Sequence, residues 1–99
     1  METIELYRAV LETFGNERQI RKLFEEIGEF EDAFCKCIDG RDKVSHVAEE
    51  MADVHNMLDQ MAVMLDCEAE VERQKQYKLR RLEQKIEEAR QNPPSKPSL

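Results

Sequence analysis

The stretch that decides the fold is EEIGEFEDAF, residues 25–34, which returns in altered form as EEMADVHNML, residues 49–58. Each stretch has two acids, an apolar residue, a small residue and a third acid in the same order. Around both of them, apolar residues recur every three or four positions, which is the period of a helix that buries one face. The sequence therefore predicts two amphipathic helices that carry matching acidic groups beside their apolar stripes.

Four helices are expected from the same period as it continues outward from these two stretches. They cover residues 4–14, 17–38, 44–65 and 68–91. Gly15 ends the first range, and the turn pair Asp39-Gly40 ends the second. Asn16 and Asp42 are of the residue types that accept backbone N–H groups at helix starts, so we expect them to be N-caps. The sequence thus predicts an all-α fold, an antiparallel helical bundle of about four helices.

The C-terminal part of the chain differs in composition from the rest. Residues 68–91 are richly charged with few apolar positions, which predicts an exposed helix or an arm packed on a partner. The final stretch NPPSKPSL, residues 92–99, has three prolines and almost nothing apolar, so we expect a disordered tail. The expected organisation is one helical domain, residues 1–91, followed by that tail.

Composition restricts the classes of function. The 99 residues include 22 acidic and 15 basic side chains, and the formal charge of −7 repels phosphate backbones, which argues against nucleic-acid binding. No apolar run approaches the roughly 20 residues of a membrane span, and no signal peptide is recognisable, so we expect a cytoplasmic protein that does not bind membranes. Three cysteines, an odd number, agree with a reducing compartment.

The shortness of the chain bears on its assembly. A single domain of this size buries only a modest core by itself, so a homodimer or homotetramer is expected. Met57 and Met64 lie on the flank of the third predicted helix rather than on its apolar stripe. That position predicts that a second subunit covers them, with a nucleobase as the alternative cover.

Acidic residues beside the two apolar stripes form the candidate site. With about 100° of rotation per residue, Ile27 and Met51 occupy the stripe centres. The acids on the matching flanks are Glu26, Glu29, Glu50 and Asp53. If the two helices run antiparallel these carboxylates converge, and their burial and mutual repulsion then favour a bound cation. Oxygen ligands select Mg²⁺, or Mn²⁺ as the alternative, over Zn²⁺, whereas a solvated acidic face is the non-functional interpretation.

Other metal sites fit the sequence less well. Cys35 and Cys37 stand two apart, so on a helix they point about 160° from each other and cannot easily grip one zinc ion together with His46 or His55. Di-iron bundles need a histidine three residues after a glutamate, a spacing that neither histidine has. A hard divalent cation is therefore the expected ligand.

The acidic pattern resembles one known family. Glu26-x-x-Glu29 followed by Glu50-x-x-Asp53 is similar to the E-x-x-E and E-x-x-D signature of the MazG-like all-α nucleoside triphosphate pyrophosphohydrolases. A glutamine ahead of the first pair, the segment EEMADVHNMLDQM and the basic segment YKLRRL add to the likeness. The resemblance covers about residues 13–88.

This resemblance implies a Mg²⁺-dependent hydrolase that cleaves a (d)NTP between the α and β phosphates and releases (d)NMP and pyrophosphate. It implies that the four acids of the signature hold the metals, and that Lys78 and Arg81 contact phosphate. These two residues stand three apart on the fourth predicted helix and share a face, although Lys75, Arg80 and Lys85 compete for the same assignment.

The proton acceptor for the attacking water stays open between Glu25 and Glu49, which lie further round the two helices. A function from a different class also stays open. It is a non-catalytic helical interaction module, in which the acidic faces are solvated and the fourth helix pairs with a partner. Pyrophosphate release with and without Mg²⁺ separates the two interpretations.

Overall fold

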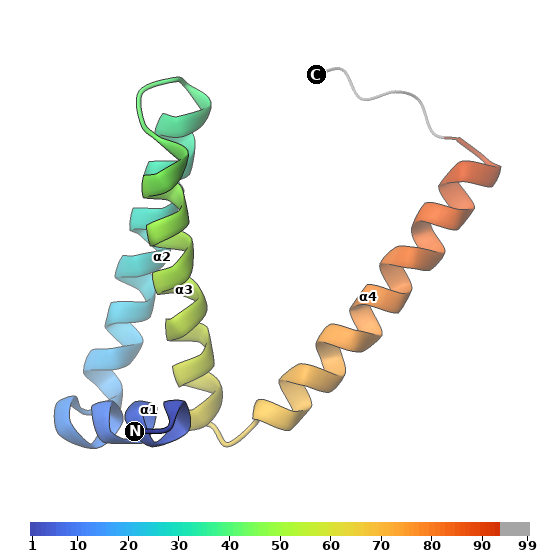
Figure 1. The fold of residues 1–99 in the computed structure, drawn as a ribbon. Coiled ribbons are helices and arrows are strands. Elements are labelled where there is room, and N and C mark those ends of the chain that lie inside the picture. Colours follow the sequence, from blue (N-terminus) through green and yellow to red (C-terminus); the bar gives the residue numbers. More distant parts are fainter. Residues whose placement is uncertain (94–99) are drawn as a thin grey trace. The chain divides into compact units, whose positions relative to one another are not determined.

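Four α-helices and no strand make up residues 1–93, the part of the chain that the computed structural model describes. The helices are α1 Thr3–Phe14, α2 Asn16–Ile38, α3 Val44–Met64 and α4 Glu68–Gln91 (Figure 1). The predicted all-α class is confirmed, and the predicted helices agree with the observed ones within one residue at every end. Asn92 and Pro93 follow α4 outside any helix, and the rest of the tail predicted for residues 92–99 lies outside the described residues.

The connection between α1 and α2 is built on Gly15. Its φ of 87° lies in a region that glycine adopts readily, and its N–H donates to the carbonyl oxygen of Leu11 at 2.9 Å. Gly15 is also the N-cap of α2, so the prediction that Asn16 is the cap was wrong. The glycine that ends α1 leads directly into α2, which leaves Asn16 as the first helical residue.

The turn pair Asp39-Gly40 ends α2 as predicted. Gly40 has a φ of 76°, and the next amide, Arg41 N–H, donates to the carbonyl oxygen of Lys36 at 2.8 Å, which satisfies one of the last carbonyls of the helix. Asp42 is not the N-cap of α3, because Lys43 occupies that position and makes no side-chain cap hydrogen bond. The Asp42 carboxylate instead accepts the N–H of Lys43 at 2.7 Å, one residue before the helix begins.

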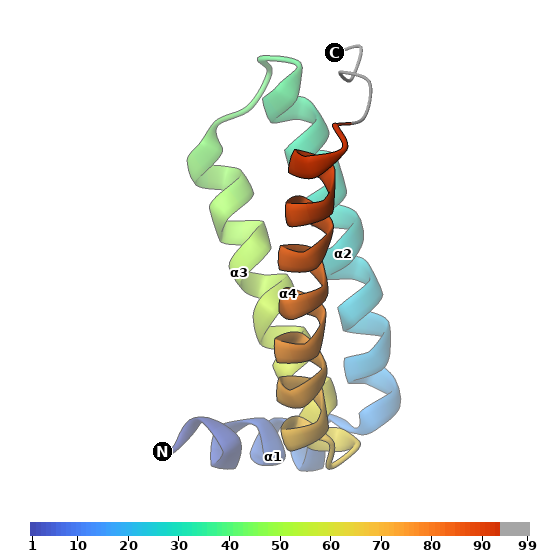
Figure 2. The ribbon, with the colours of Figure 1, turned by 90° about the vertical axis from the view of Figure 1, so that its right-hand side faces the viewer.

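An antiparallel hairpin of α2 and α3 is the centre of the fold, and α1 crosses the end of that hairpin farthest from the turn at residues 39–43 (Figure 1 and Figure 2). The buried apolar side chains are Ala33, Val47, Met57 and Met61. Met57 is only 8% exposed, so the expectation that a single chain leaves it uncovered was wrong, whereas a second subunit at this flank stays a prediction. Met64 is half-buried.

The buried face of α2 repeats every seven residues, at Gln19, Glu26 and Ala33. Glu26 rather than Ile27 therefore lies at the centre of the packed face. On α3, the predicted central residue Met51 is 40% exposed. Paired helices bury only a narrow strip, and the apolar stripes of this sequence extend past it on one side. Both predicted stripe centres were consequently displaced from the observed buried face.

Many large apolar side chains of the first three helices and their connections stay exposed. The most exposed of them between residues 20 and 65 are Phe24, Ile38, Val44 and Leu65. Such a surface agrees with the expected association of chains, which stays a prediction.

The chain divides into two compact units, Met1–Glu68 and Ala69–Leu99. Over the described residues the helical part of the second unit is α4, in which no residue is buried. The single domain expected over residues 1–91 stays a prediction. Between residues 1 and 93, no helix combines the length and the apolar character that crossing a bilayer would require.

Candidate functional site

Three carboxylates from two helices come together on the hairpin. Glu26 and Glu29 belong to α2 and Glu50 to α3, and one oxygen atom of each lies within 4.8 Å of the others. Within residues 1–93, this is the one set of three or more Asp, Glu, His or Cys side chains whose ligand atoms gather so closely. The antiparallel pairing of α2 and α3 thus brings together three of the four acids singled out by the sequence.

Glu26 is the buried member of this acidic group. It is 8% exposed, and its Oε1 lies 3.4 Å from the Lys22 ammonium one helical turn earlier. Its Oε2 is buried and has no hydrogen-bond partner. Burial raises the pKa of Glu26 above its ordinary 4.5; the Lys22 contact opposes this, and the negative charges of Glu29 and Asp53 add to it. The site therefore holds a carboxylate that lacks full compensation from the protein itself.

Glu50 is half-buried and stands on the α3 side of the group. Its Oε1 lies 3.2 Å from Nε2 of His46, and its Oε2 is buried without a hydrogen-bond partner, as in Glu26. Glu29 is exposed. Two of the three acids thus present one oxygen that is engaged by a neighbour on the same helix and one that is free.

Asp53 lies outside the close group. Its side chain is exposed, although it is near enough for its charge to raise the pKa of Glu26. Glu25 and Glu49, the two candidates for the proton acceptor, are exposed and also lie outside the close group. Their roles stay predictions.

Two neighbours of the acidic group were missed by the sequence reasoning. Lys22 precedes Glu26 by four residues, and His46 precedes Glu50 by four residues, so each pair shares a helix face. The same spacing links His46 to Asp42, whose Oδ2 lies 2.6 Å from Nδ1 of the ring. The i,i+4 spacing was visible in the sequence, but Asp42 was assigned to a cap and His46 was considered only as a zinc or di-iron ligand.

The pKa values of Asp42 and His46 are both shifted by the contact between the two side chains. The pKa of His46 is raised above its ordinary 6.5, first by the hydrogen bond with Asp42 and then by that carboxylate's charge, with a smaller contribution from Glu50. The pKa of Asp42 is lowered, first by the same hydrogen bond and then by the N–H of Lys43. The two groups therefore favour their charged forms together.

The two candidate phosphate ligands, Lys78 and Arg81, are exposed residues of α4. Together with Leu82 and Lys85 they line a shallow hollow, and the guanidinium carbon of Arg81 lies 6.0 Å from the centre of the Tyr77 ring. Because α4 belongs to the second compact unit, its pairing with the acids of α2 and α3 stays a prediction.

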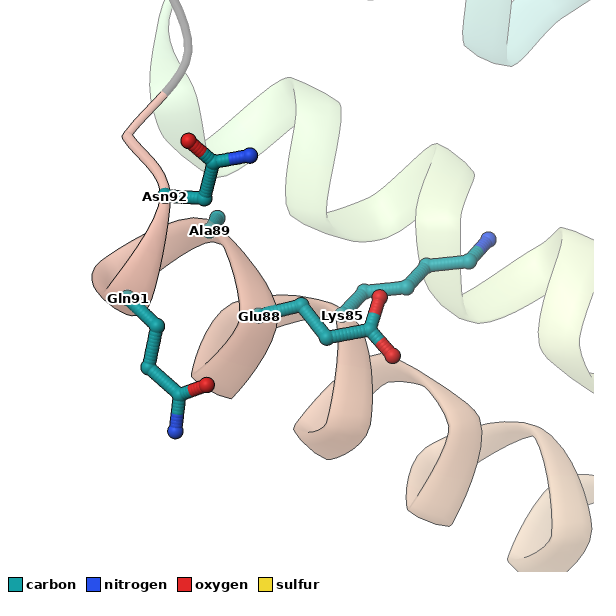
Figure 3. Close-up of a pocket in the computed structure, with 5 residues that line it drawn as sticks. All are labelled: Lys85, Glu88, Ala89, Gln91 and Asn92. Carbon is teal, nitrogen blue, oxygen red and sulfur yellow. The ribbon is translucent and has the colours of Figure 1, made fainter.

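A second hollow lies at the C-terminal end of α4. It is lined by Lys85, Glu88, Ala89, Gln91 and Asn92, side chains of a single helix end and the residue after it (Figure 3). One cationic, one anionic, one apolar and two amide side chains line it, and none of the acids of the close group takes part. It offers no set of convergent ligands comparable to the acidic group.

The acidic group supplies oxygen atoms alone as ligands, from three carboxylates that repel one another. Such a set suits a hard divalent ion, Mg²⁺ or Mn²⁺, better than Zn²⁺. The Oε2 atoms of Glu26 and Glu50 fit this chemistry, because a buried carboxylate oxygen without a hydrogen-bond donor is open to a cation; Oε1 of Glu68, outside the group, is buried without a partner as well. When the chain is compared with models of protein families, with curated proteins and with solved structures, none of the three comparisons gives a match.

Proposed function

We propose that this chain is a Mg²⁺-dependent nucleotide pyrophosphohydrolase that converts a (d)NTP to (d)NMP and pyrophosphate, in the manner of the MazG-like enzymes. The observation that carries the proposal is the meeting of Glu26, Glu29 and Glu50 across two antiparallel helices, with two buried carboxylate oxygens left without partners. Surface acids that share one helix face are common, whereas this group draws its carboxylates from two helices and includes two buried oxygens without hydrogen-bond partners.

The residues present fit a Mg²⁺ ion. Glu26, Glu29 and Glu50 would hold it, with Asp53 as the neighbouring fourth acid of the signature. When bound, Mg²⁺ neutralises and orients a triphosphate and makes water more acidic. An acidic protein of charge −7 would then accept its anionic substrate together with the cation.

Side chains outside the acidic group complete the proposal. Glu25 and Glu49 are exposed acids that directly precede Glu26 and Glu50 in the sequence, and either would accept the proton of the attacking water. Lys78 and Arg81 contribute positive charge from α4 and would contact phosphate oxygens. The proposal assigns them these roles from their chemistry and from the resemblance to the family.

The test is pyrophosphate release from a panel of nucleoside triphosphates, with Mg²⁺ and with EDTA. Monophosphate and pyrophosphate are the expected products, and Glu50→Gln should lower the rate at least about a hundredfold because it removes a ligand charge. Glu31→Gln, which changes an exposed acid of the same helix as Glu26, is the matched control and should keep the wild-type rate. Diphosphate and orthophosphate as primary products would contradict the proposed reaction.

The exposed apolar side chains favour a second candidate, the helical interaction module. Phe24, Ile38 and Val44 are 65%, 73% and 75% exposed, which is typical of a surface that binds another protein. A chain that releases no pyrophosphate under any metal condition, and whose Glu50→Gln variant binds Mg²⁺ as the wild type does, would support this candidate over the enzyme.

A further inference from the structure

A line of three polar side chains runs along the start of α3. Asp42 Oδ2 lies 2.6 Å from Nδ1 of His46, and Nε2 of the same ring lies 3.2 Å from Oε1 of Glu50. The residues are spaced by four, so His46 and Glu50 share one face of α3, and Asp42, which precedes the helix, lies next to His46 on that side. The imidazole thus connects an acid outside the proposed metal site to an acid inside it.

The two carboxylate oxygens of Glu50 have different surroundings because only one of them contacts His46. Oε1 faces the ring, whereas Oε2 is buried and has no hydrogen-bond partner. Glu26 contributes an independent sign of a ligand site, because its side chain is nine-tenths buried and its Oε2 also lacks a partner. A carboxylate held through one oxygen keeps the other in a restricted set of positions, which lowers the ordering cost when a cation binds.

We propose that His46 is a positioning residue for the acidic group: Nε2–H holds Glu50 through Oε1, Asp42 fixes the plane of the ring, and Oε2 of Glu50 is thereby kept available to a divalent cation. The inference rests on the proposed metal-binding function of Glu26, Glu29 and Glu50. It goes beyond that function by assigning a task to two residues, Asp42 and His46, that carry no ligand role themselves.

If His46 only stabilised the start of α3, a different nitrogen of its ring would have to donate the hydrogen bond. Lys43 gives α3 no side-chain cap, so the Asp42–His46 contact could serve only to fix the start of the helix. That role needs the donor at Nδ1, whereas positioning of Glu50 needs the donor at Nε2. Asparagine places an amide nitrogen near the position of Nδ1, and glutamine places one near the position of Nε2. The two substitutions therefore separate the two roles.

The experiment measures Mn²⁺ binding by the EPR signal of the free ion, at one fixed pH, for the full chain and its variants. His46→Gln should keep a Kd close to that of the wild type, whereas His46→Asn and His46→Ala should weaken binding about 10- to 100-fold. His55→Gln changes the other histidine, which is also exposed on α3, and should leave the Kd unchanged. Competition with Mg²⁺ extends the comparison to the proposed ion, and helicity in EDTA checks that each variant is folded.

Equal Kd values for all four histidine variants would overturn the positioning role while leaving the metal site in place. Retained binding by His46→Asn together with lost binding by His46→Gln would also overturn it, in favour of the helix-start role. If His46→Ala does not fold, the comparison of the Asn and Gln variants still decides. Absence of Mn²⁺ binding by the wild type would overturn the inference by removing the proposed function on which it rests.

Discussion

Replacement of Glu26 by glutamine tests whether the acidic group stores electrostatic repulsion in the metal-free protein. Glu26 is 8% exposed, and one of its carboxylate oxygens has no hydrogen-bond partner. Glutamine has nearly the same volume and no charge, and its amide can donate to the neighbouring carboxylates. The substitution therefore removes the repulsion without leaving a cavity.

The magnitude follows from the distances. At 4.8 Å, the outer separation within the group, two unit charges repel by about 0.9 kcal/mol in water and by about 3.5 kcal/mol at an effective dielectric constant of 20. Glu26 faces two such acids, Glu29 and Glu50. The attraction to Lys22 at 3.4 Å offsets about 1.2 to 5 kcal/mol over the same range of dielectric constant. The net repulsion is then about 0.5 to 2 kcal/mol, towards the lower end because Glu29 and Lys22 are solvated.

The assay is urea unfolding at neutral pH in EDTA. Glu26→Gln should raise the free energy of unfolding by about 0.5 to 2 kcal/mol. Glu31→Gln, an exposed acid on the same helix, is the control and should change it by less than about 0.5 kcal/mol. A Glu26→Gln protein that is less stable than the wild type in EDTA would refute the reasoning, because the contact with Lys22 would then outweigh the repulsion.

In Mg²⁺ the wild type should become more stable than Glu26→Gln, the reverse of their order in EDTA, if the acids bind the ion. The wild type should gain RT ln(1 + [Mg²⁺]/Kd), since the ion binds the folded state alone, and Glu26→Gln should gain much less. Glu50→Gln and Asp53→Asn should behave in the same way, as more stable apo proteins with a smaller response to Mg²⁺. Equal gains in all of these proteins would mean that the acidic group is only a solvated face.

Three further predictions concern the core, the start of α3 and assembly. Gln60 donates to Gln19 at 2.8 Å between buried side chains, so Gln60→Leu should cost about 1 to 3 kcal/mol in urea unfolding, and adding Gln19→Leu should recover most of that loss rather than add to it. The lowered pKa of Asp42 means that its contribution to stability is present above pH 3.8 and is lost as the pH falls through the folded-state pKa. A ¹³C NMR titration should show this low pKa, and His46→Ala should raise it. An unchanged pKa in that variant would contradict the contact between Asp42 and His46. Light scattering after size exclusion should give a dimer or larger at micromolar concentration, and an active monomer would rule out a shared interface.

Helix positions were predictable because they depend on short-range features. The glycines of the two turns, Gly15 and Gly40, have positive φ values, and each stands where a run of helical periodicity ends. Capping was less predictable, because Asn16 and Asp42 have the right chemistry one residue away from the observed N-caps. Residue type alone does not distinguish a cap from its neighbour when the turn geometry is set by another residue.

The rotation of each helix about its axis was the feature that periodicity determined poorly. An error of one residue in the centre of a stripe is a rotation of about 100°, which is enough to move a side chain from a flank to the seam, the buried face along which α2 and α3 pack. Glu26 moved inward in this way, whereas Met51 and Asp53 are exposed. The convergence of Glu26, Glu29 and Glu50 could still be predicted, because long carboxylate side chains on facing helices meet over a range of rotations.

The position of Glu26 in the seam also connects the small core to the proposed chemistry. The seam residues of α2 are Gln19, Glu26 and Ala33, so two of its three positions are polar where apolar side chains would stabilise a helix pair more. Gln19 has its partner in Gln60, whereas Glu26 keeps one buried oxygen unpaired. Stability alone does not explain an acid at this buried position, because leucine there would not lower the stability of the helix pair. A bound cation would explain it, because the cation would take the unpaired oxygen of Glu26 as a ligand. The proposed cation would bind only when α2 and α3 are packed together. A substitution at Ala33 that shifts Glu26 relative to Glu50 should therefore reduce the gain in stability from Mg²⁺, whereas one that leaves the acids in place should lower stability without changing that gain.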